Sequence, residues 1–275
     1  MIDGSYMRMY SFTKMEGLGN DFIVIDDRNK MIDFNDETVR WLCDRHFGIG
    51  ADGLILLRPV ADNSVDFAWR FFNADGSIAE MCGNGIRCIG AYLVERNLVD
   101  ENKETVRIQT QTRAVQIRLL RNSAGSFQAA EVDMGQAAVT AESLALNGLE
   151  FFCVSMGNPH AVLFVPDVNV APVATLGPCI EQDAAFPGKT NVEFASVQDR
   201  STLYLRVWER GVGETLACGT GACAAVVAAF LKGYCDPQVT VYLPGGALQI
   251  AIDPATLQVM MTGPARSVFE GSILI

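Results

Sequence analysis

Two cysteines occupy nearly matching sequences half a chain apart. Cys82 begins the segment CGNGIRC and Cys218 begins CGTGAC, and an apolar stretch typical of a helix follows each of them. A thiol at a helix N-terminus is predicted to have a pKa lowered from about 8.5 towards neutrality, because the helix dipole and unbonded backbone N–H groups stabilise its anion. Two such thiols facing one substrate could remove a proton from one side of a carbon atom and return a proton to the other.

The surroundings of the two cysteines are also repeated. RFFNADG begins at Arg70 and RVWERG at Arg206, with the same offset that separates the cysteines. GNDFIVID at Gly19 is matched by GNPHAVLFV at Gly157, with nearly that offset again. Because the paired segments follow in the same order, we predict two homologous halves. Their predicted bounds are 1–126 with 265–275 for the N-terminal half and 127–264 for the C-terminal half.

Each half is predicted to consist mostly of sheet. Apolar and β-branched stretches bounded by turn residues indicate strands at 20–26, 53–58, 65–73, 104–109, 114–120, 127–133, 151–155, 160–165, 191–197, 201–209, 238–243, 247–252, 258–262 and 268–274. Helices are indicated at 35–45, 84–97 and 219–233. The predicted fold class is α+β, with each half a mostly antiparallel sheet or barrel curled around a central helix that begins at a cysteine.

The composition excludes several classes of protein. A net charge of −11 argues against nucleic acid or an anionic membrane as a partner, because both require basic surface patches. The sequence has neither the run of about 20 apolar residues of a membrane-spanning helix nor a signal peptide, so a cytoplasmic protein is expected. Eight cysteines without a Cys-x-x-Cys pair, and only two histidines, favour free thiols over disulfides or a metal site.

The remaining cysteines are expected to be core residues, because a free cysteine is among the most buried residue types. This expectation covers Cys43, Cys88, Cys153, Cys179, Cys223 and Cys235.

Polar residues at the ends of predicted strands are further candidates. Arg210 could hold a carboxylate and Glu209 an ammonium group, although a solvated turn would have the same sequence. His160 is interpreted either as a core histidine or as a modulator of a nearby thiol. The asparagines at strand–turn junctions suit turns as well as ligand binding; they are Asn20, Asn73, Asn158 and Asn191.

Two cofactor motifs are incomplete. GIGADG at 48–53 matches Gly-x-Gly-x-x-Gly, but a predicted helix precedes it and a predicted strand follows, the reverse of a dinucleotide-binding unit. PGKTN at Pro187 ends like a P-loop, but Asp183 stands where its first glycine is required. Lys189 lacks the neighbours expected around pyridoxal phosphate. We therefore expect no cofactor.

The chain resembles the diaminopimelate epimerase family in the segments GLGNDFIVID, HFGIGADGLI, FNADGSIAEMCGNGIRC, SMGNPHAV, TNVEF, WERGVGETLACGTGACAA and YLPGG, from about Thr13 to the C-terminus. The resemblance implies a cofactor-independent epimerase that interconverts LL- and meso-diaminopimelate in lysine and peptidoglycan precursor synthesis. It also implies two pseudo-symmetric domains, a final strand that returns to the first, and a homodimer.

The same resemblance implies roles for single residues. Cys82 and Cys218 would be the acid/base pair, and His160 and Glu209 would tune thiol ionisation. The substrate would contact Asn20, Asn73, Gly83, Asn84, Asn158, Asn191, Glu209, Arg210, Gly219 and Thr220. The chain departs from the family at Gly53, where some relatives carry a substrate-contacting glutamine, so this contact is expected to be absent or made by the backbone.

Two alternative functions stay open. A proline-racemase-like enzyme would also use paired cysteines in Cys-Gly-x-Gly settings, but its ring substrate has no second charged end, so Glu209, Arg210 and the asparagines favour the longer substrate. A non-catalytic amino-acid-binding protein could instead form a Cys82–Cys218 disulfide as a redox switch, and it would bind its ligand without exchanging the α-proton.

Overall fold

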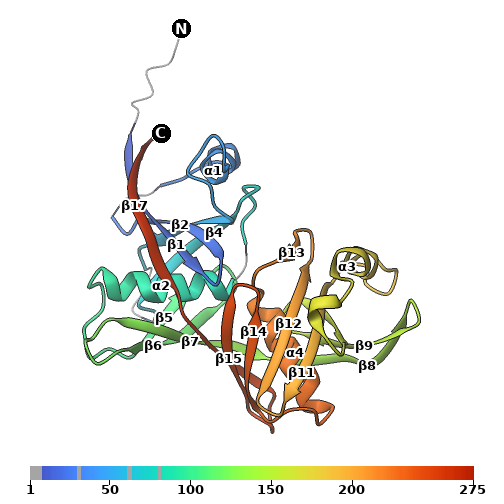
Figure 1. Cartoon of the computed structure of the whole chain (residues 1–275). Coiled ribbons are helices and arrows are strands. Elements are labelled where there is room, and N and C mark those ends of the chain that lie inside the picture. The colour runs from blue at the N-terminus through green and yellow to red at the C-terminus, as the bar shows by residue number, and fades with distance from the viewer. Residues whose placement is uncertain (1–7, 30–31, 61–63, 80–81) are drawn as a thin grey trace. The chain divides into compact units, whose positions relative to one another are not determined.

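The computed structural model describes residues 8–29, 32–60, 64–79 and 82–275. The chain forms two compact units, Met1–Ala130 with Ala265–Ile275 (unit 1) and Glu131–Pro264 (unit 2) (Figure 1). One division, at 264/265, falls where the predicted bound lies. The other falls slightly after the predicted 126/127, inside strand β7 (Phe127–Gln136).

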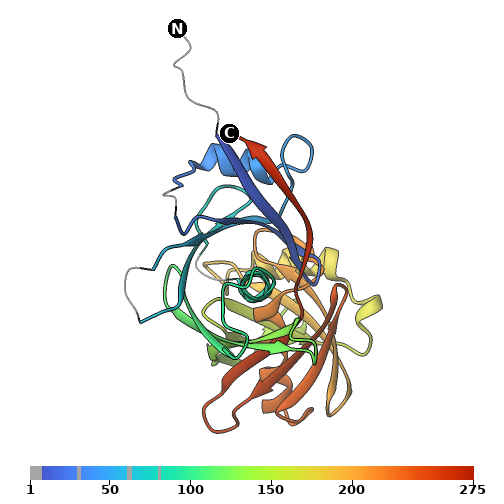
Figure 2. The ribbon, with the colours of Figure 1, turned by 90° about the vertical axis from the view of Figure 1, so that its left-hand side faces the viewer.

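Unit 1 is a sheet wrapped around one helix. Its strands are β1 (Met9–Gly17), β2 (Asn20–Asp26), β3 (Gly53–Arg58), β4 (Phe67–Asn73), β5 (Thr105–Gln109), β6 (Ala114–Arg121) and β17 (Arg266–Leu274). They pair in the order β17, β1, β2, β3, β4, β5, β6. Helix α2 (Gly83–Glu95) packs against β1, β2, β6 and β17, and Figure 2 shows its turquoise ribbon end-on among them. Helix α1 (Asp36–Cys43) precedes β3 and is capped by Asn35.

Strand β17, at the C-terminus, closes unit 1 by pairing antiparallel with β1, so that Thr13 lies opposite Glu270. The expectation that the final strand returns to the first is confirmed. The pairing also explains why residues 265–275 belong to unit 1 although they follow the whole of unit 2 in sequence.

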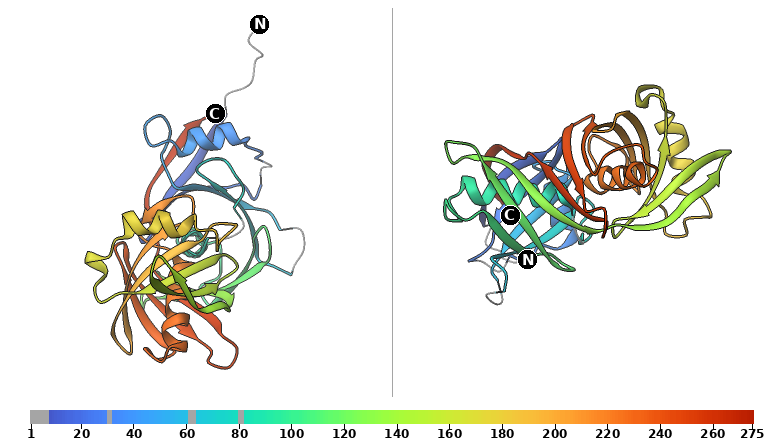
Figure 3. Two further views of the ribbon diagram at one scale, coloured as in Figure 1. Left: turned by 90° about the vertical axis from the view of Figure 1, so that its right-hand side faces the viewer. Right: turned by 90° about the horizontal axis from the view of Figure 1, so that it is seen from below.

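Unit 2 has the same construction. Its strands after β7 are β8 (Ala138–Leu146), β9 (Leu149–Ser155), β10 (Pro159–Phe164), β11 (Asn191–Asp199), β12 (Thr202–Glu209), β13 (Gly213–Thr215), β14 (Gln238–Leu243), β15 (Gly246–Ile252) and β16 (Gln258–Gly263). Helix α4 (Gly219–Leu231) is buried along most of its length, as its continuous apolarity predicts, and the right-hand view of Figure 3 shows it in orange, enclosed by these strands. The 3₁₀ turn η1 (Val168–Val170) and helix α3 (Val173–Glu181) link β10 to β11.

The two units share one series of strand pairings. From β1 to β6, neighbours are antiparallel, parallel, antiparallel, parallel and antiparallel, and the series β9, β10, β11, β12, β14, β15 is the same. Phe22 pairs with Gly53 as His160 pairs with Asn191, at the offset that relates Gly19 to Gly157. The predicted α+β fold with two pseudo-symmetric halves is confirmed.

Three strands, helix α3 and the short turn η1 were not predicted from sequence. Strand β8 is rich in alanine and leucine, which favour helices, and it is a strand because it pairs with β9. Strand β1 carries the consecutive buried residues Thr13 and Lys14, whose side chains point to opposite faces, so neither face of the strand is continuously apolar in sequence. Helix α3 contains Gly177 and Pro178, which usually end helices. The short β13 completes a hairpin with β12.

Candidate active site

Cys82 is the N-cap residue of α2 and is partly buried. Its Sγ atom lies 3.7 Å from Oδ1 of Asn20, the first residue of β2, and the thiol donates to that oxygen. The same oxygen accepts a hydrogen bond from Nδ2 of Asn84, in the first turn of α2, at 3.1 Å. An amide oxygen beside the sulfur favours the protonated thiol, because a thiolate has no hydrogen to donate.

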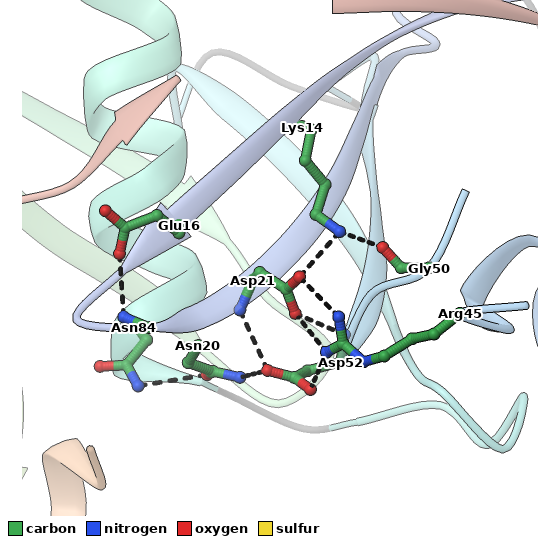
Figure 4. A network of polar contacts seen from close by, with 9 residues as sticks. Lys14, Glu16, Asn20, Asp21, Arg45, Gly50, Asp52 and Asn84 are labelled. Atoms are coloured by element: carbon green, nitrogen blue, oxygen red, sulfur yellow. Dashed lines mark hydrogen bonds and ion pairs between the residues drawn. The ribbon is translucent and has the colours of Figure 1, made fainter. Parts of the chain in front are cut away.

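A charged network fixes the orientation of the Asn20 amide (Figure 4). Nδ2 of Asn20 donates to Oδ2 of Asp52 at 2.7 Å, and Oδ1 of Asp52 accepts from Arg45 at 2.8 Å. Asp21 lies between Arg45 and Lys14, at 2.8 Å and 2.7 Å. Burial alone would raise the pKa of Asp21, but hydrogen bonds from Arg45 and Lys14 outweigh it and hold this pKa well below its ordinary value. With Nδ2 engaged by Asp52, the amide presents its oxygen to the thiol.

Asn73 and Gly53 lie opposite each other at the ends of β4 and β3. The Asn73 side chain donates to Oγ of Ser77 at 2.9 Å, within the turn that follows β4. A Cβ atom at Gly53 would lie 2.6 Å from both the Phe71 ring and the Phe72 carbonyl oxygen. No side chain fits there without movement of the backbone, so only backbone atoms of residue 53 can contact a ligand.

Cys218 is the N-cap residue of α4 and is almost fully buried. Its Sγ accepts from the backbone N–H of Gly221 at 3.3 Å and lies 3.5 Å from Oγ1 of Thr220. The prediction that the helix start lowers this thiol pKa was wrong. Burial raises the pKa of Cys218 well above its ordinary value, and the carboxyl groups of Glu209 and Glu193 add to this effect when they are ionised. The two hydrogen bonds offset only part of that rise.

Glu209, the last residue of β12, interacts directly with Cys218. Its carboxyl accepts from the Thr215 hydroxyl at 2.6 Å. Burial raises the pKa of Glu209, although the nearby Thr215 hydroxyl and Cys218 thiol both favour its ionised form. Arg210, the next residue, is exposed; its guanidinium donates to the Gly188 carbonyl at 3.2 Å and has no carboxylate partner among the described residues. Glu209 is thus directed at the thiol, and Arg210 keeps donors for an anion.

His160 joins a second chain of hydrogen bonds that ends at the same sulfur. Its Nδ1 lies 2.7 Å from Oε1 of Glu193 and its Nε2 lies 3.0 Å from Oδ1 of Asn158. Nδ2 of Asn158 donates to Oγ1 of Thr220 at 3.4 Å, and Thr220 contacts Cys218. His160 and Glu193 are both buried. Of the two interpretations left open for His160, this contact series favours modulation of the thiol.

Asn191, the first residue of β11, uses both ends of its amide to hold backbone in place. Nδ2 donates to the carbonyl of Pro159 at 2.8 Å, and Oδ1 accepts from the N–H of Arg210 at 3.0 Å. The side chain therefore ties the start of β10 to the end of β12. This position fixes where the Arg210 side chain begins.

The structure gathers most of the predicted site residues into two clusters, one in each unit. The unit 1 cluster comprises Cys82, Gly83, Asn84 and Asn20. The unit 2 cluster comprises Cys218, Gly219, Thr220, Asn158, His160 and Glu209, with Asn191 and Arg210 beside it. Asn73 stands apart in its turn with Ser77.

Sequence reasoning missed Asp52 and Glu193. Asp52 lies in the GIGADG segment, whose glycine spacing indicates nucleotide binding and predicts nothing about the aspartate. Glu193 interrupts the otherwise apolar start of β11, where the residues on both sides of it are buried. A charged residue inside a buried strand requires a buried partner, so this interruption was the available signal.

The other cysteines lie apart from both clusters. Burial raises the pKa of Cys43 to about 12, of Cys153 to about 11 and of Cys235 to about 11. Cys88 and Cys223 are fully buried within α2 and α4. Cys179 corrects the expectation of six core cysteines: it is exposed on α3, where its thiol donates to the Thr175 carbonyl.

Within the described ranges, no group of three or more His, Cys, Asp or Glu side chains is placed to hold a metal ion. None of the helices in that same part of the chain is long and apolar enough to cross a bilayer.

Solved structures share this fold at low sequence identity. The phenazine biosynthesis protein of the PhzF family from Bacillus anthracis has a TM-score of 0.75 at 16% identity, with 98% of this chain and all of that chain covered. A hydroxyproline epimerase from Agrobacterium vitis has a TM-score of 0.75 at 14% identity, covering 98% and 94%. A predicted epimerase from Pseudomonas aeruginosa has a TM-score of 0.74 at 19% identity, covering 97% and 99%. These similarities establish the fold.

Sequence relatives are closer. A diaminopimelate epimerase from Methanococcus maripaludis is 43% identical, covering 95% of this chain and 99% of the relative. Those from Halothermothrix orenii and Nostoc sp. are both 46% identical, covering 96% and 95% of this chain and 98% and 99% of the relatives. The family description "Diaminopimelate epimerase" matches residues 12–140 and 152–268. With that match spanning both cysteine clusters, the chain belongs to the diaminopimelate epimerase family.

Proposed function

We propose that this chain interconverts LL- and meso-diaminopimelate without a cofactor, with Cys82 and Cys218 as the two acid/base groups. The observation that carries this proposal is the difference between the two thiols. Cys82 donates to an amide oxygen, whereas Cys218 accepts from a backbone N–H and is influenced by the Glu209 carboxyl group. A two-base reaction requires one group as thiol and the other as thiolate, and unequal environments support that division.

The proposed reaction moves one proton in and one proton out. A thiolate takes the α-hydrogen as a proton, and the electron pair of the C–H bond stays on carbon. The opposite thiol then gives its proton to the other face, becoming the thiolate, so the roles exchange for the reverse direction. Before the first step, Glu209 accepts the proton of Cys218, with which it already interacts. The N-termini of α2 and α4 supply the dipoles that stabilise the developing negative charge.

Substrate binding is proposed for the residues that the family resemblance implies. Backbone N–H groups at the helix starts would bind the reacting carboxylate, and Arg210 would bind a carboxylate with its free donors. The full proposed set is Asn20, Asn73, Gly83, Asn84, Asn158, Asn191, Glu209, Arg210, Gly219 and Thr220, with Glu209 and His160 also acting on thiol ionisation. Asn191 has one amide hydrogen left for such a contact.

Proton exchange in heavy water tests the proposal. The reduced protein is incubated in D₂O with LL-diaminopimelate, and the product is analysed for meso isomer and for deuterium. We expect one deuterium at the epimerised α-carbon, and none when L-proline or trans-4-hydroxyproline is supplied. Binding of diaminopimelate without exchange would favour the amino-acid-binding alternative, and exchange with proline alone would favour the racemase alternative.

We propose further that the active form is a cytoplasmic homodimer and that 1–126 with 265–275 and 127–264 are its two epimerase halves. Exposed apolar side chains on the paired strands β1 and β17 support self-association; they are Met9, Val268, Phe269 and Leu274. Sedimentation equilibrium should give twice the chain mass of 29.8 kDa. A mass of 29.8 kDa at micromolar concentration would reject the dimer.

A further inference from the structure

Glu193 and His160 form a buried ionisable pair on the neighbouring strands β11 and β10. Neither side chain is exposed, and Oε1 and Nδ1 are 2.7 Å apart. The second carboxyl oxygen, Oε2, has no hydrogen-bond partner among the described residues. Burial raises the pKa of Glu193. A neutral carboxylic acid fits this geometry, because an ionised carboxylate would leave a charged oxygen buried without a donor.

The direction of each hydrogen bond follows from a protonated Glu193. The acid donates from Oε1 to Nδ1 of His160, so the ring carries its hydrogen on Nε2 and donates it to Oδ1 of Asn158. The Asn158 amide then has its Nδ2 side directed at Thr220, to whose oxygen it donates. Because the Thr220 oxygen accepts from Asn158, its hydroxyl hydrogen is available to donate to Sγ of Cys218.

Unit 1 shows what occupies the positions equivalent to His160 and Glu193 in the other copy of the repeated fold. At the offset that relates Gly19 to Gly157, the position equivalent to His160 in unit 1 is Phe22 and the position equivalent to Glu193 is Ile55. Both of these unit 1 residues are buried. The helix starts confirm the match: a Cβ at Gly85 would lie 3.2 Å from Ile55, and a Cβ at Gly221 would lie 2.8 Å from Glu193. Unit 1 therefore packs the same position with hydrocarbon, so the fold does not need a polar pair there.

The two equivalent asparagines face opposite ways. Asn20 gives its Nδ2 to Asp52 and turns its oxygen to Asn84 and the Cys82 thiol. Asn158 gives its oxygen to His160 and turns its Nδ2 to Thr220. An amide oxygen towards a thiol favours S–H, and a donor chain towards a thiol favours S⁻.

We propose that Glu193 is a positioning residue that holds the proton of His160 on Nε2. Through that proton it orients the amide of Asn158, and with it the hydroxyl of Thr220, as donors towards Cys218. This role deepens the proposed function, on which its catalytic meaning rests, but the hydrogen-bond order itself can be measured without any substrate.

Nitrogen-15 NMR of the full-length protein tests the proton position directly. The chain has only two histidines, His46 and His160, so histidine-labelled protein gives two ring systems, and a His46→Asn variant assigns them. We expect His160 protonated at Nε2 in the wild type and in Glu193→Gln, whose amide can donate to Nδ1 in place of the acid. In Glu193→Ile we expect a mixture of ring tautomers. A His160 ring whose Nε2 lacks hydrogen in the wild type would overturn the proposal.

Alkylation of Cys218 by iodoacetamide as a function of pH tests the consequence, with Cys82 of the same molecule as the control. The ionisable groups that act on the Cys218 thiol are Glu209 from β12 and Glu193 from β11, and His160 from β10 acts on both of these carboxyl groups. An ionised Glu193 would raise the pKa of the Cys218 thiol, whereas a neutral Glu193 exerts no such charge effect. With Glu193 neutral, we expect Glu193→Ile to lower the thiolate fraction of Cys218 about three- to tenfold at a fixed pH, as loss of one directed hydrogen bond predicts. Glu193→Gln should stay within about twofold of the wild type.

Three outcomes separate the possible failures. A Cys218 that ionises more readily in Glu193→Ile would overturn the proposal, because Glu193 would then act as an opposing charge. Equal behaviour of the glutamine and isoleucine variants would also overturn it, since only one of them can donate to His160. If the NMR and alkylation results hold while diaminopimelate shows no α-proton exchange, the proposed function fails and the positioning role stands.

Discussion

The Cys82 and Cys218 clusters occupy the same place in the same repeated unit, yet their hydrogen bonds run in opposite directions. Both cysteines cap a central helix, and an asparagine at the start of the second strand of the pairing series belongs to each cluster. At Cys82 that asparagine offers an oxygen, and at Cys218 its counterpart offers a hydrogen through Thr220. The scaffold thus places the thiols, and the partners of the two asparagines decide whether an amide oxygen or a chain of hydrogen-bond donors is directed at each thiol.

The carboxyl groups are distributed just as unequally. Asn73 and Glu209 each end the fourth strand of their pairing series, at the offset that separates the two cysteines, so an amide occupies in unit 1 the place of a carboxyl in unit 2. In unit 2 Glu209 can accept a proton from Cys218, and burial raises the pKa of both groups. Duplication with divergence has therefore produced one thiol beside amides and one beside a proton acceptor.

Among the changes that test the difference between the two clusters, removal of either thiol should have the largest effect on epimerisation. Cys82→Ala and Cys218→Ala should each lower epimerisation by about 10³-fold or more, because each deletes an acid or base that nothing else replaces. The measurement is meso-diaminopimelate formation from the LL isomer. Near wild-type turnover by either variant would reject the two-base mechanism, and Cys179→Ala on the exposed face of α3 is the control that should keep full activity.

Replacing the His160–Glu193 pair of unit 2 by the apolar pair of unit 1 should lower turnover without lowering the melting temperature. In His160→Phe with Glu193→Ile, the pair becomes the one that unit 1 already packs, so we expect an unchanged or higher melting temperature. Turnover should fall about 10²-fold, because Asn158 and Thr220 lose their fixed orientation. Calorimetry and the epimerisation assay on one preparation measure both.

The single variants give that experiment its control. His160→Phe alone leaves the buried Glu193 carboxyl without its partner, and it should melt at a lower temperature than the double variant. A double variant that melts lower than both singles would show that the pair is structural and would contradict its assignment to function.

Sequence alone revealed the parts of the site that are repeated and missed the parts that differ between the halves. Cys82 and Cys218 are recognisable because their Cys-Gly-x-Gly segments recur, and the helix starts follow from the apolar stretches after them. The pKa of Cys218 could not be predicted, because it depends on burial and on carboxyl groups from β11 and β12 that only folding brings to the sulfur. A dipole argument from the helix alone omits those larger effects.

The difference between Asn20 and Asn158 was equally hidden. Both follow a glycine, and nothing in the sequence says which end of an amide faces a thiol. In unit 1 the hydrogen bond to Asp52 sets the direction of the amide, and in unit 2 the hydrogen bonds of His160 with Asn158 and Glu193 set it. Asp52 and Glu193 each lie on the far side of a strand connection from the asparagine that they affect. Contacts over such separations need the strand register, which composition and spacing do not supply.

Reversal of the Asn20 amide should have an intermediate effect. In Asp52→Asn, residue 52 no longer offers acceptors to both Asn20 and Arg45, so the amide loses its fixed direction. We expect turnover to fall about tenfold and Cys82 to be alkylated at lower pH, with Cys218 unchanged. Asp33→Asn, which removes a surface ion pair with Arg70, is the control. An unchanged Cys82 would mean that Asp52 does not set the amide.

The smallest expected effect is on the free energy of unfolding in acid, and it arises from Asp21 in unit 1. The folded-state pKa of Asp21 is lowered, so its contribution is fully present above the unfolded-state value of 3.8 and is lost as pH falls through the folded-state value. Asp21→Asn should therefore reduce the free energy of unfolding by on the order of 1–2 kcal/mol at pH 7, and by progressively less below about pH 4. Urea titrations at both pH values measure the difference. The equivalent position in unit 2 is Pro159, which cannot titrate, so this acid sensitivity is expected only in unit 1. A stability difference between wild type and variant that grew in acid would contradict its assignment to the Lys14–Asp21–Arg45 network.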